Sequence, residues 1–249
     1  MEKDILQIKN LKKIYHTKKE ETLAVEDFSL NLKKGEFVSI VGPSGCGKST
    51  ILSILCGLID KSDGNINYDS HIRIGYMLQN DSLLEFRSIL KNCLLGLEIK
   101  KELTKENIEY VTNLLKTYGL KDFINSYPEN LSGGMRQRVA LIRTLATKPD
   151  ILLLDEPFSA LDYQTRLAVS DDVYKILKKE KKSAIMVTHD LAEAISMSDR
   201  IIVLTGRPSR IKNIYDIKLT NKTTPIENRK TKEFPEYYDK IWKDIDFHV

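Results

Sequence analysis

The segment from Phe37 to Thr50 limits the possible fold of this 249-residue chain more than any other part of it. The apolar run Phe37-Val38-Ser39-Ile40-Val41 leads directly into Gly42-Pro43-Ser44-Gly45-Cys46-Gly47-Lys48-Ser49-Thr50, which matches the phosphate-loop pattern GxxxxGK followed by Ser or Thr. Apolar residues then recur at helical spacing, at Ile51, Leu52, Ile54, Leu55, Leu58 and Ile59. A strand, a glycine loop and a helix in this order predict an α/β fold with an anion site at the end of a strand.

The loop combines several groups that bind phosphate. Its glycines allow backbone N–H groups to converge on phosphate oxygens, and the following helix presents its positive N-terminal end to the same anion. We expect Lys48 to reach the β and γ phosphates of a nucleotide and Ser49 to offer its hydroxyl to Mg²⁺. Cys46 is interpreted as a small space-filling residue without a catalytic role. The loop residues predicted to bind the nucleotide are Gly42, Ser44, Gly45, Cys46, Gly47, Lys48, Ser49 and Thr50.

A second motif ends an apolar strand with two carboxylates. Ile151-Leu152-Leu153-Leu154 is followed by Asp155 and Glu156, as expected for a buried strand that delivers charge at its carboxyl end. Asp155 is the predicted Mg²⁺ partner, directly or through water, and Glu156 is placed to polarise an attacking water. The alternative for this hexapeptide alone is an acidic turn after a core strand, and the phosphate loop upstream favours the first interpretation.

The rest of the chain alternates between two hydrophobic periods. Residues 5 to 41 alternate apolar and polar side chains, which is the period of half-buried strands. Between about 81 and 149 the spacing becomes helical, and we interpret this stretch as an inserted helical lobe. Beyond it, helical stretches separate short apolar strands at 151–154, 184–188 and 201–204. Such alternation predicts a mainly parallel sheet covered by helices.

Composition narrows the class of protein further. With 41% apolar and 30% charged residues, the chain can bury one substantial core, or one core and a small lobe. The N-terminus lacks the apolar run of a secretory signal, and no apolar run approaches the ~20 residues of a membrane-spanning helix. The cysteines, Cys46, Cys56 and Cys93, show no CxxC spacing, which favours a reduced cytosolic setting. The net charge of +4 is spread along the chain and does not require nucleic acid as a partner.

A serine-glycine turn opens a basic helix shortly before the acidic strand. Its sequence is Leu131-Ser132-Gly133-Gly134, followed by Met135-Arg136-Gln137-Arg138. A helix N-terminus with two glycines favours anions. Together with the phosphate loop and the acidic strand end, this segment resembles the signature of ATP-binding cassette ATPases. The resemblance implies that Ser132, Gly133 and Gly134 bind the γ-phosphate of ATP held by a second copy of the subunit, so that two copies sandwich the nucleotide.

The resemblance also assigns roles to four single positions. Tyr15, in a polar loop after the first strand, corresponds to the aromatic residue that stacks on adenine; alone it reads as a partly buried loop tyrosine. Gln79 matches the glutamine that senses Mg²⁺ and water. Asp162 belongs to the segment that matches the loop crossing the dimer interface. His189 matches the switch histidine that contacts the γ-phosphate. A lone histidine after a strand would otherwise be a packing or surface residue. The predicted metal site comprises Ser49, Gln79 and Asp155, and the predicted catalytic residues are Gln79, Glu156 and His189.

The fold implied by the resemblance is the phosphate-loop NTPase (RecA-like) core, with an N-terminal antiparallel β subdomain and an inserted helical subdomain. Residues 1–249 would form one cassette domain. Its nucleotide-binding core would comprise about 1–80 and 150–212, its helical signature subdomain about 81–149, and its C-terminal extension 213–249. Its sequence leaves open whether that extension binds a regulator; the simpler interpretation is a packed or dangling C-terminal segment.

Two features are similar to the branch of the family that serves nitrate, sulfonate, taurine and thiamine-precursor importers. They are the run Asp199-Arg200-Ile201-Ile202-Val203-Leu204 followed by Gly206-Arg207-Pro208-Ser209-Arg210-Ile211, and the aromatic stretch around Tyr238 and Trp242. The segment Leu83-Leu84-Glu85-Phe86-Arg87 departs from that branch, which usually has proline and tryptophan after the leucine pair. This segment should face the permease, so the departure bears on the transported solute and not on ATP hydrolysis.

The resemblance therefore implies an ATPase subunit that uses ATP and Mg²⁺, dimerises on ATP, and drives a separate membrane permease from the cytoplasmic face of the cell membrane. A solute-binding protein would be an indirect partner, and no nucleic acid is expected. The alternative is a soluble cassette ATPase that acts on nucleic acid or ribosomes, but the chain lacks a long coiled-coil insertion, a second cassette and a strongly basic surface. A non-hydrolysing regulatory module would be expected to lack Glu156 or His189, and both are present.

Overall fold

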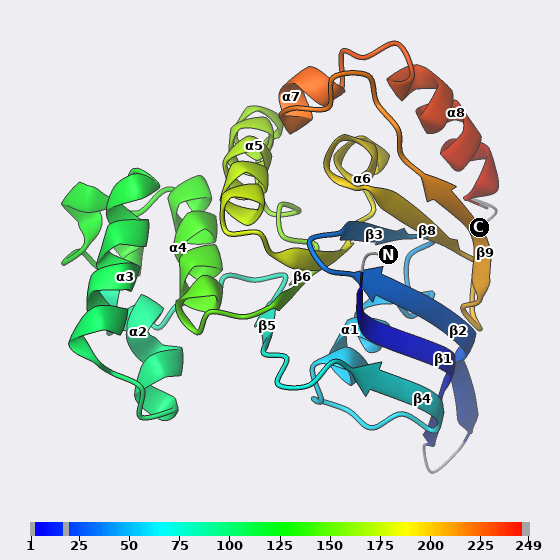
Figure 1. The fold of residues 1–249 in the computed structure, drawn as a ribbon, viewed down its shortest axis with the longest axis horizontal. Coiled ribbons are helices and arrows are strands. Elements are labelled where there is room, and N and C mark those ends of the chain that lie inside the picture. The colour runs from blue at the N-terminus through cyan, green and yellow to red at the C-terminus, as the bar shows by residue number, and fades with distance from the viewer. Residues whose placement is uncertain (1–2, 17–19, 246–249) are drawn as a thin grey trace.

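The computed structural model describes residues 3–16 and 20–245. Figure 1 shows the strands gathered in one half of the molecule and a lobe of helices in the other. The strands are β1 (Asp4–His16), β2 (Glu21–Lys33), β3 (Phe37–Val41), β4 (Asp63–Tyr68), β5 (Ile74–Met77), β6 (Ile151–Asp155), β7 (Ser183–Val187), β8 (Arg200–Leu204) and β9 (Ile211–Asp216). The α-helices are α1 (Lys48–Leu55), α2 (Ile89–Ile99), α3 (Lys105–Thr117), α4 (Gly133–Ala146), α5 (Tyr163–Lys179), α6 (Leu191–Met197), α7 (Pro225–Asn228) and α8 (Phe234–Asp244).

The central sheet has the strand order β5-β6-β7-β3-β8-β9. All neighbouring pairs are parallel except β8 and β9, which are antiparallel. Every residue of β3, β6 and β7 is buried, because helices cover both faces of the sheet, and this explains why these strands read as continuous apolar runs. The predicted mainly parallel sheet is confirmed.

A separate antiparallel sheet has the order β2-β1-β4. One apolar cluster joins this sheet, α1 and the central sheet, and it contains Leu6 of β1, Ile51 and Leu52 of α1, and Leu153 of β6. The helix that follows the phosphate loop is therefore held by apolar contacts with both sheets, which fixes the loop between them (Figure 1).

The structure corrects the predicted position of Tyr15. β1 continues to His16 and pairs Tyr15 with Thr22 of β2, so Tyr15 is a strand residue and not a loop residue. The pairing of these strands shifts register between Leu11 and Lys13 and again between Lys13 and Ile14. Such irregularities interrupt the alternation of side chains by which a strand is recognised in sequence.

The helical lobe lies between β5 and β6 in the chain. Its helices begin at polar caps: the side chain of Ser88 accepts a hydrogen bond from the backbone of Lys91 at the start of α2, and Thr104 does the same for Asn107 at the start of α3. Its core is continuous with one face of the central sheet, because α4 packs against α2, α3, α5 and β5. The short 3₁₀ helices Lys121–Phe123 and Pro128–Asn130 connect α3 to α4.

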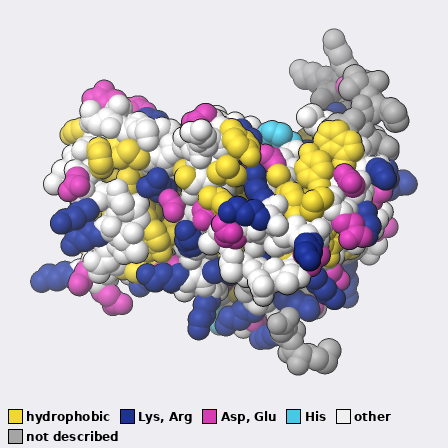
Figure 2. Space-filling model, turned by 90° about the horizontal axis from the view of Figure 1, so that it is seen from above, with side chains coloured by type: hydrophobic (Ala, Val, Ile, Leu, Met, Phe, Trp, Pro, Cys, Tyr) yellow, Lys and Arg dark blue, Asp and Glu magenta, His cyan; other side chains and the backbone are white. Residues whose placement is uncertain are grey.

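The C-terminal extension packs against the sheet edge. β9 pairs with β8, and α8 packs on α6. Ile241 of α8 is fully buried in a cluster with Leu191 and Ile195 of α6, whereas Trp242 is 49% exposed and stacks on Tyr238. Residues 246–249 of the predicted extension lie outside the described residues. Over its described part, the extension is a packed layer. The face of the molecule seen from above carries hydrophobic, basic and acidic side chains intermixed (Figure 2).

A buried carboxylate links the end of β7 to α5 and α6. Glu193 is 3% exposed; it accepts a hydrogen bond of 2.8 Å from the Thr188 hydroxyl and lies 3.8 Å from the Arg166 guanidinium. Burial, together with the nearby Asp190 carboxylate, raises the pKa of Glu193 to about 7, although Thr188, Arg166 and Arg229 act in the opposite direction.

The buried position of α8 leads to a prediction about local stability. Ile241→Ala should weaken the docking of α8 by about 2–4 kcal/mol, because it removes fully buried methylene groups. Trp242→Ala is the matched control on the same helix, since it removes a half-exposed ring. Hydrogen exchange of the α8 amides should accelerate far more in the first variant than in the second, and equal acceleration would show that Ile241 does not anchor the helix.

The environment of Glu193 predicts a pH dependence. Between its ordinary pKa of 4.5 and its folded value of about 7, the folded state binds more protons than the unfolded state, so the free energy of unfolding falls as the pH rises. The parent should lose up to about 3 kcal/mol from this group, and Glu193→Gln should not. The free energy of unfolding should therefore be measured with denaturant at about pH 5 and about pH 8. From the lower to the higher pH, the stability of the variant relative to the parent should increase. Parallel pH profiles of the two proteins would contradict this assignment.

Candidate functional site

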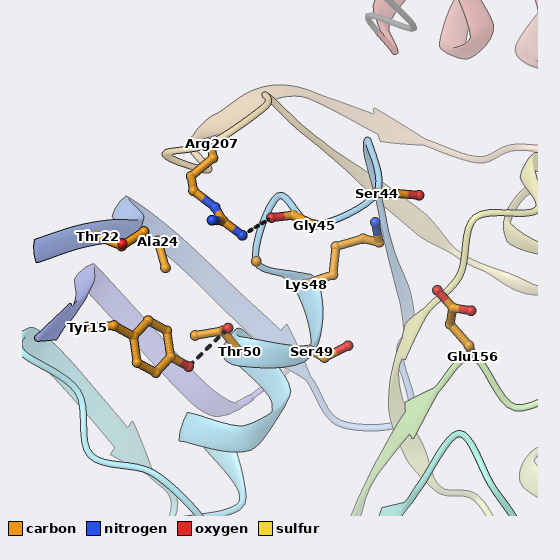
Figure 3. Close-up of a pocket in the computed structure, with 11 residues that line it drawn as sticks. Tyr15, Thr22, Ala24, Ser44, Gly45, Lys48, Ser49, Thr50, Glu156 and Arg207 are labelled. Atoms are coloured by element: carbon orange, nitrogen blue, oxygen red, sulfur yellow. Dashed lines mark hydrogen bonds between the residues drawn. The ribbon is translucent and has the colours of Figure 1, made fainter. Parts of the chain in front are cut away.

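A pocket of about 460 Å³ lies where the phosphate loop meets the antiparallel sheet (Figure 3). Its walls come from β1 and β2 on one side, from the loop and the start of α1, and from the segments that follow β6 and β8. The residues that line it are Tyr15, Thr22, Ala24, Ser44, Gly45, Gly47, Lys48, Ser49, Thr50, Glu156 and Arg207.

The backbone of the loop requires glycine at two positions. Gly45 and Gly47 have φ angles of 71° and 123°, which side chains other than glycine rarely adopt. A Cβ atom on Gly47 would also lie 3.1 Å from the Ala24 carbonyl oxygen and from the Ser209 hydroxyl. The loop therefore curls tightly between β3 and α1 and passes close to β2.

The side chain of Lys48 is held by backbone carbonyl groups of the phosphate loop. Its Nζ donates hydrogen bonds of 2.8 Å to the backbone oxygens of Gly42 and of Pro43, and the residue is 7% exposed. Cys46 is buried beside it, and burial raises the pKa of the Cys46 thiol above its usual value. A protonated thiol is a poor nucleophile, which agrees with the space-filling interpretation of Cys46.

The carboxylate of Asp155 at the end of β6 accepts hydrogen bonds from two hydroxyl groups. Ser49 Oγ donates to Asp155 Oδ1 at 2.9 Å, and the Tyr76 hydroxyl donates to Oδ2 at 3.0 Å. Burial raises the pKa of Asp155, and these two hydrogen bonds oppose that shift. A hydroxyl and a carboxylate side by side are oxygen ligands of the kind that Mg²⁺ prefers.

Three predicted residues converge at the same edge of the sheet. Gln79 Nε2 donates to Glu156 Oε2 at 3.2 Å, and His189 Nδ1 lies 3.2 Å from the same oxygen. These residues follow β5, β6 and β7, whose parallel pairing places their carboxyl ends side by side. Glu156 has φ +44°, an uncommon conformation for a residue with a side chain, and such backbone strain is concentrated at functional sites.

Tyr15 stands at the opposite end of the pocket. Its hydroxyl lies 3.3 Å from Thr50 Oγ1, and Lys13 Nζ lies 5.0 Å from the centre of its ring. Figure 3 shows the ring reaching from β1 toward the start of α1. The pocket thus has an aromatic ring at one end and the Glu156 carboxylate at the other.

The serine-glycine turn and Asp162 do not line this pocket. Ser132 caps α4 by accepting from the Met135 backbone at 3.4 Å, and Asp162 caps α5 by accepting from the Thr165 backbone at 3.0 Å. Ser132, Gly133 and Asp162 are exposed, whereas Gly134 is buried against α5. The starts of α4 and α5 therefore lie at the surface, where a second molecule can reach them.

Two residues of the site escaped the sequence analysis. Tyr76 holds Asp155, but only the pairing of β5 with β6 brings it there. Arg207, in the turn between β8 and β9, donates from Nη2 to the Gly45 carbonyl oxygen at 2.8 Å and lines the pocket. In the sequence, Arg207 belongs to a run that is similar to one branch of the family, and nothing in that run predicts a contact with the phosphate loop.

Comparison with known proteins adds an independent line of evidence. Residues 25–159 match the family model of the ABC transporter. An uncharacterized ABC transporter ATP-binding protein of Bacillus subtilis is 45% identical, with 96% of this chain and 95% of that protein aligned. The taurine import ATP-binding protein of Jannaschia sp. is 38% identical over 86% and 82% of the two chains, and the nitrate import ATP-binding protein of a Synechocystis strain is 36% identical over 94% and 91%.

Solved structures that resemble this fold belong to the same family. An ATP-binding cassette solved as a dimer in a post-hydrolysis state, bound to ADP and Pi, superposes with a TM-score of 0.72 and 32% identity over 86% of this chain and 99% of that one. The predicted fold class is confirmed, and so is the resemblance on which it depended. Because the identity extends over nearly the whole length of several relatives, we conclude that this chain belongs to the ATP-binding cassette family, as an ABC transporter ATPase.

Proposed function

We propose that the protein hydrolyses ATP to energise an importer, and that its solute belongs to the nitrate, sulfonate, taurine or pyrimidine-precursor class. The convergence of Gln79 and His189 on one oxygen of Glu156, beside the phosphate loop, is the observation that carries the catalytic part of this proposal. The names of the taurine and nitrate import relatives support the solute class.

The residues of the loop fit the phosphates of ATP together with Mg²⁺. Lys48 and the backbone N–H groups of the loop would bind the β and γ phosphates, and Tyr15 would stack on adenine at the other end of the pocket. Ser49 and Asp155 would hold Mg²⁺, with Gln79 nearby. When bound, Mg²⁺ neutralises charge that develops on the phosphate oxygens.

Glu156 is the proposed general base. Its carboxylate would take a proton from the attacking water, while Gln79 and His189 hold that carboxylate and the water in line with the γ-phosphate. His189 is 55% exposed and Glu156 21%, so both can meet a nucleotide that enters from the pocket.

A second copy of the subunit would complete the site. Ser132, Gly133, Gly134 and Asp162 stand outside the pocket of their own chain, at the starts of α4 and α5. We assign them to the nucleotide bound by the partner copy. The dimeric cassette structures among the relatives support this arrangement.

The helical lobe carries the proposed contact with the permease. Phe86 is 79% exposed and borders a groove of about 440 Å³, which is lined by Phe86, Arg87, Lys91, Leu94, Glu98 and Leu103. Among the described residues, no helix has the length and apolar character needed to cross a bilayer. From the exposed groove at Phe86 and the names of the import relatives, we propose that the subunit works at the cytoplasmic face of the membrane through a separate permease, which receives the solute from a binding protein.

Removal of the proposed base gives a direct test. Glu156→Gln should lower steady-state phosphate release by about 100-fold or more, because general base catalysis contributes at least this much, while ATP binding is retained. Glu236→Gln, an exposed carboxylate on α8, is the control and should behave as the parent does. Hydrolysis by Glu156→Gln at the parental rate would show that another group activates the water.

The assignment of Ser132 to the partner's nucleotide predicts complementation between two inactive variants. Ser132→Arg should bind ATP normally yet hydrolyse it at least about 100-fold more slowly, since the altered turn loses the contacts by which it caps the partner's γ-phosphate. Thr104→Arg is a matched control, because it also removes an exposed helix cap and lies at α3. Full activity of Ser132→Arg would contradict the assignment.

Mixing then distinguishes a site shared by two subunits from a site within one. Lys48→Ala lacks a competent phosphate loop, and Ser132→Arg lacks a competent capping turn. A dimer containing one of each has one complete site, so the mixture should hydrolyse ATP faster than either variant alone. Phosphate release that equals the average of the two separate variants would show that Lys48 and Ser132 of one subunit act in one site within that subunit.

A further inference from the structure

The turn between β8 and β9 places a cation over the phosphate loop. Arg207 Nη2 donates to the Gly45 carbonyl oxygen at 2.8 Å, and the side chain lines the same pocket as Tyr15 and Lys48. Figure 3 shows Arg207 descending on the loop from this turn, while Tyr15 approaches from the antiparallel sheet. The guanidinium therefore stands above the stretch of pocket between the aromatic ring and the lysine.

The turn that carries Arg207 is firmly attached to β2. Ser209 is fully buried and donates to the Ala24 carbonyl oxygen from both its backbone nitrogen and its hydroxyl, at 3.0 and 3.1 Å. Its own carbonyl oxygen accepts from the Glu26 backbone at 2.9 Å, and Arg210 forms an ion pair of 2.6 Å with the Glu26 carboxylate. The backbone of Arg207 is thus already in place, which lowers the entropy that a contact with a ligand would cost.

The charges around the pocket favour an anion at this place. Lys48 and Arg207 are the two cations among the side chains that line it, and Glu156 is the one acid, at the far end. Lys48 is nearly buried and already bonded to loop carbonyls, whereas Arg207 is exposed and uses one of its N–H donors for Gly45 among the described residues. A planar guanidinium with free donors matches the oxygens of a phosphate group in geometry and charge.

We infer that Arg207 is a further nucleotide-binding residue, which contacts the part of the phosphate chain that ATP and ADP share. The inference deepens the proposed function and rests on it. Adenine on Tyr15 and the terminal phosphates at Lys48 leave the first phosphates of the chain beneath Gly45 and Arg207. Arg207 stands away from Glu156, so it sets the affinity for both nucleotides and leaves the rate of the chemical step nearly unchanged.

The experiment compares three variants with the parent by calorimetric titration of Mg-ADP. Arg207→Gln removes the charge but keeps an amide that can donate to Gly45, and Arg207→Lys keeps the charge. Arg210→Gln changes the other arginine of the turn, whose ion pair with Glu26 lies outside the pocket. Because the contact is charge-assisted, Arg207→Gln should raise the Kd for ADP about tenfold at about 50 mM salt, and less at about 500 mM salt. The Kd of Arg207→Lys and of Arg210→Gln should stay within about threefold of the parent value, and kcat at saturating ATP should change less than about twofold in Arg210→Gln.

Two outcomes would overturn the inference. An unchanged Kd in Arg207→Gln at low salt would show that the guanidinium does not contact the nucleotide. If Arg207→Gln instead lost affinity for ADP equally at both salt concentrations and lost kcat by the same factor, Arg207 would only support the structure of the phosphate loop. Failure of the parent to bind ADP, or binding by Lys48→Ala as tight as that of the parent, would instead refute the proposed function itself.

Discussion

The parallel pairing of β5, β6, β7 and β3 is the constraint on which the rest of this structure depends. The register sets Met77 beside Leu154, Leu154 beside Met186, and Ile40 beside Val187, so four strands end at one edge of the sheet. The phosphate loop and the proposed catalytic residues are attached just beyond those ends. The phosphate loop follows β3, Gln79 follows β5, the two acids close β6, and His189 follows β7. Ser49 and Asp155, which are 106 positions apart in the chain, and Gln79 and Glu156, which are 77 apart, are thereby brought within hydrogen-bonding distance.

Burial creates the electrostatic character of this edge. Fully buried strands deliver Asp155 into a place where its carboxylate is desolvated and depends on hydroxyl donors from Ser49 and Tyr76. The strained backbone of Glu156 turns its side chain toward Gln79 and His189. Such a conformation persists because the packed sheet on either side of it holds the chain in place.

Local motifs carried much of the information needed to predict this site. The phosphate loop and the apolar run before Asp155 are read within single segments, because loop geometry and strand burial leave direct marks on sequence. Tyr76 and Arg207 were not found, since their roles depend on which strand lies next to which and on a turn that returns to β2. Tyr15 was placed in a loop because bulges in β1 hide the alternation of its side chains. The packing of α8 depends on Ile241, whose spacing alone does not reveal its partner α6.

The proposed site is divided between two surfaces of the molecule. One surface holds the pocket, and the other exposes Ser132, Gly133 and Asp162 at the starts of neighbouring helices. In the proposed sandwich, catalysis requires two copies whereas ADP binding requires one. The most direct measurement is the specific ATPase activity over a range of protein concentrations, with the fraction of dimer followed by sedimentation in the same samples. Activity per subunit should fall with the dimer fraction on dilution while the affinity for ADP stays constant. Constant activity per subunit in samples that contain only monomer would contradict the account.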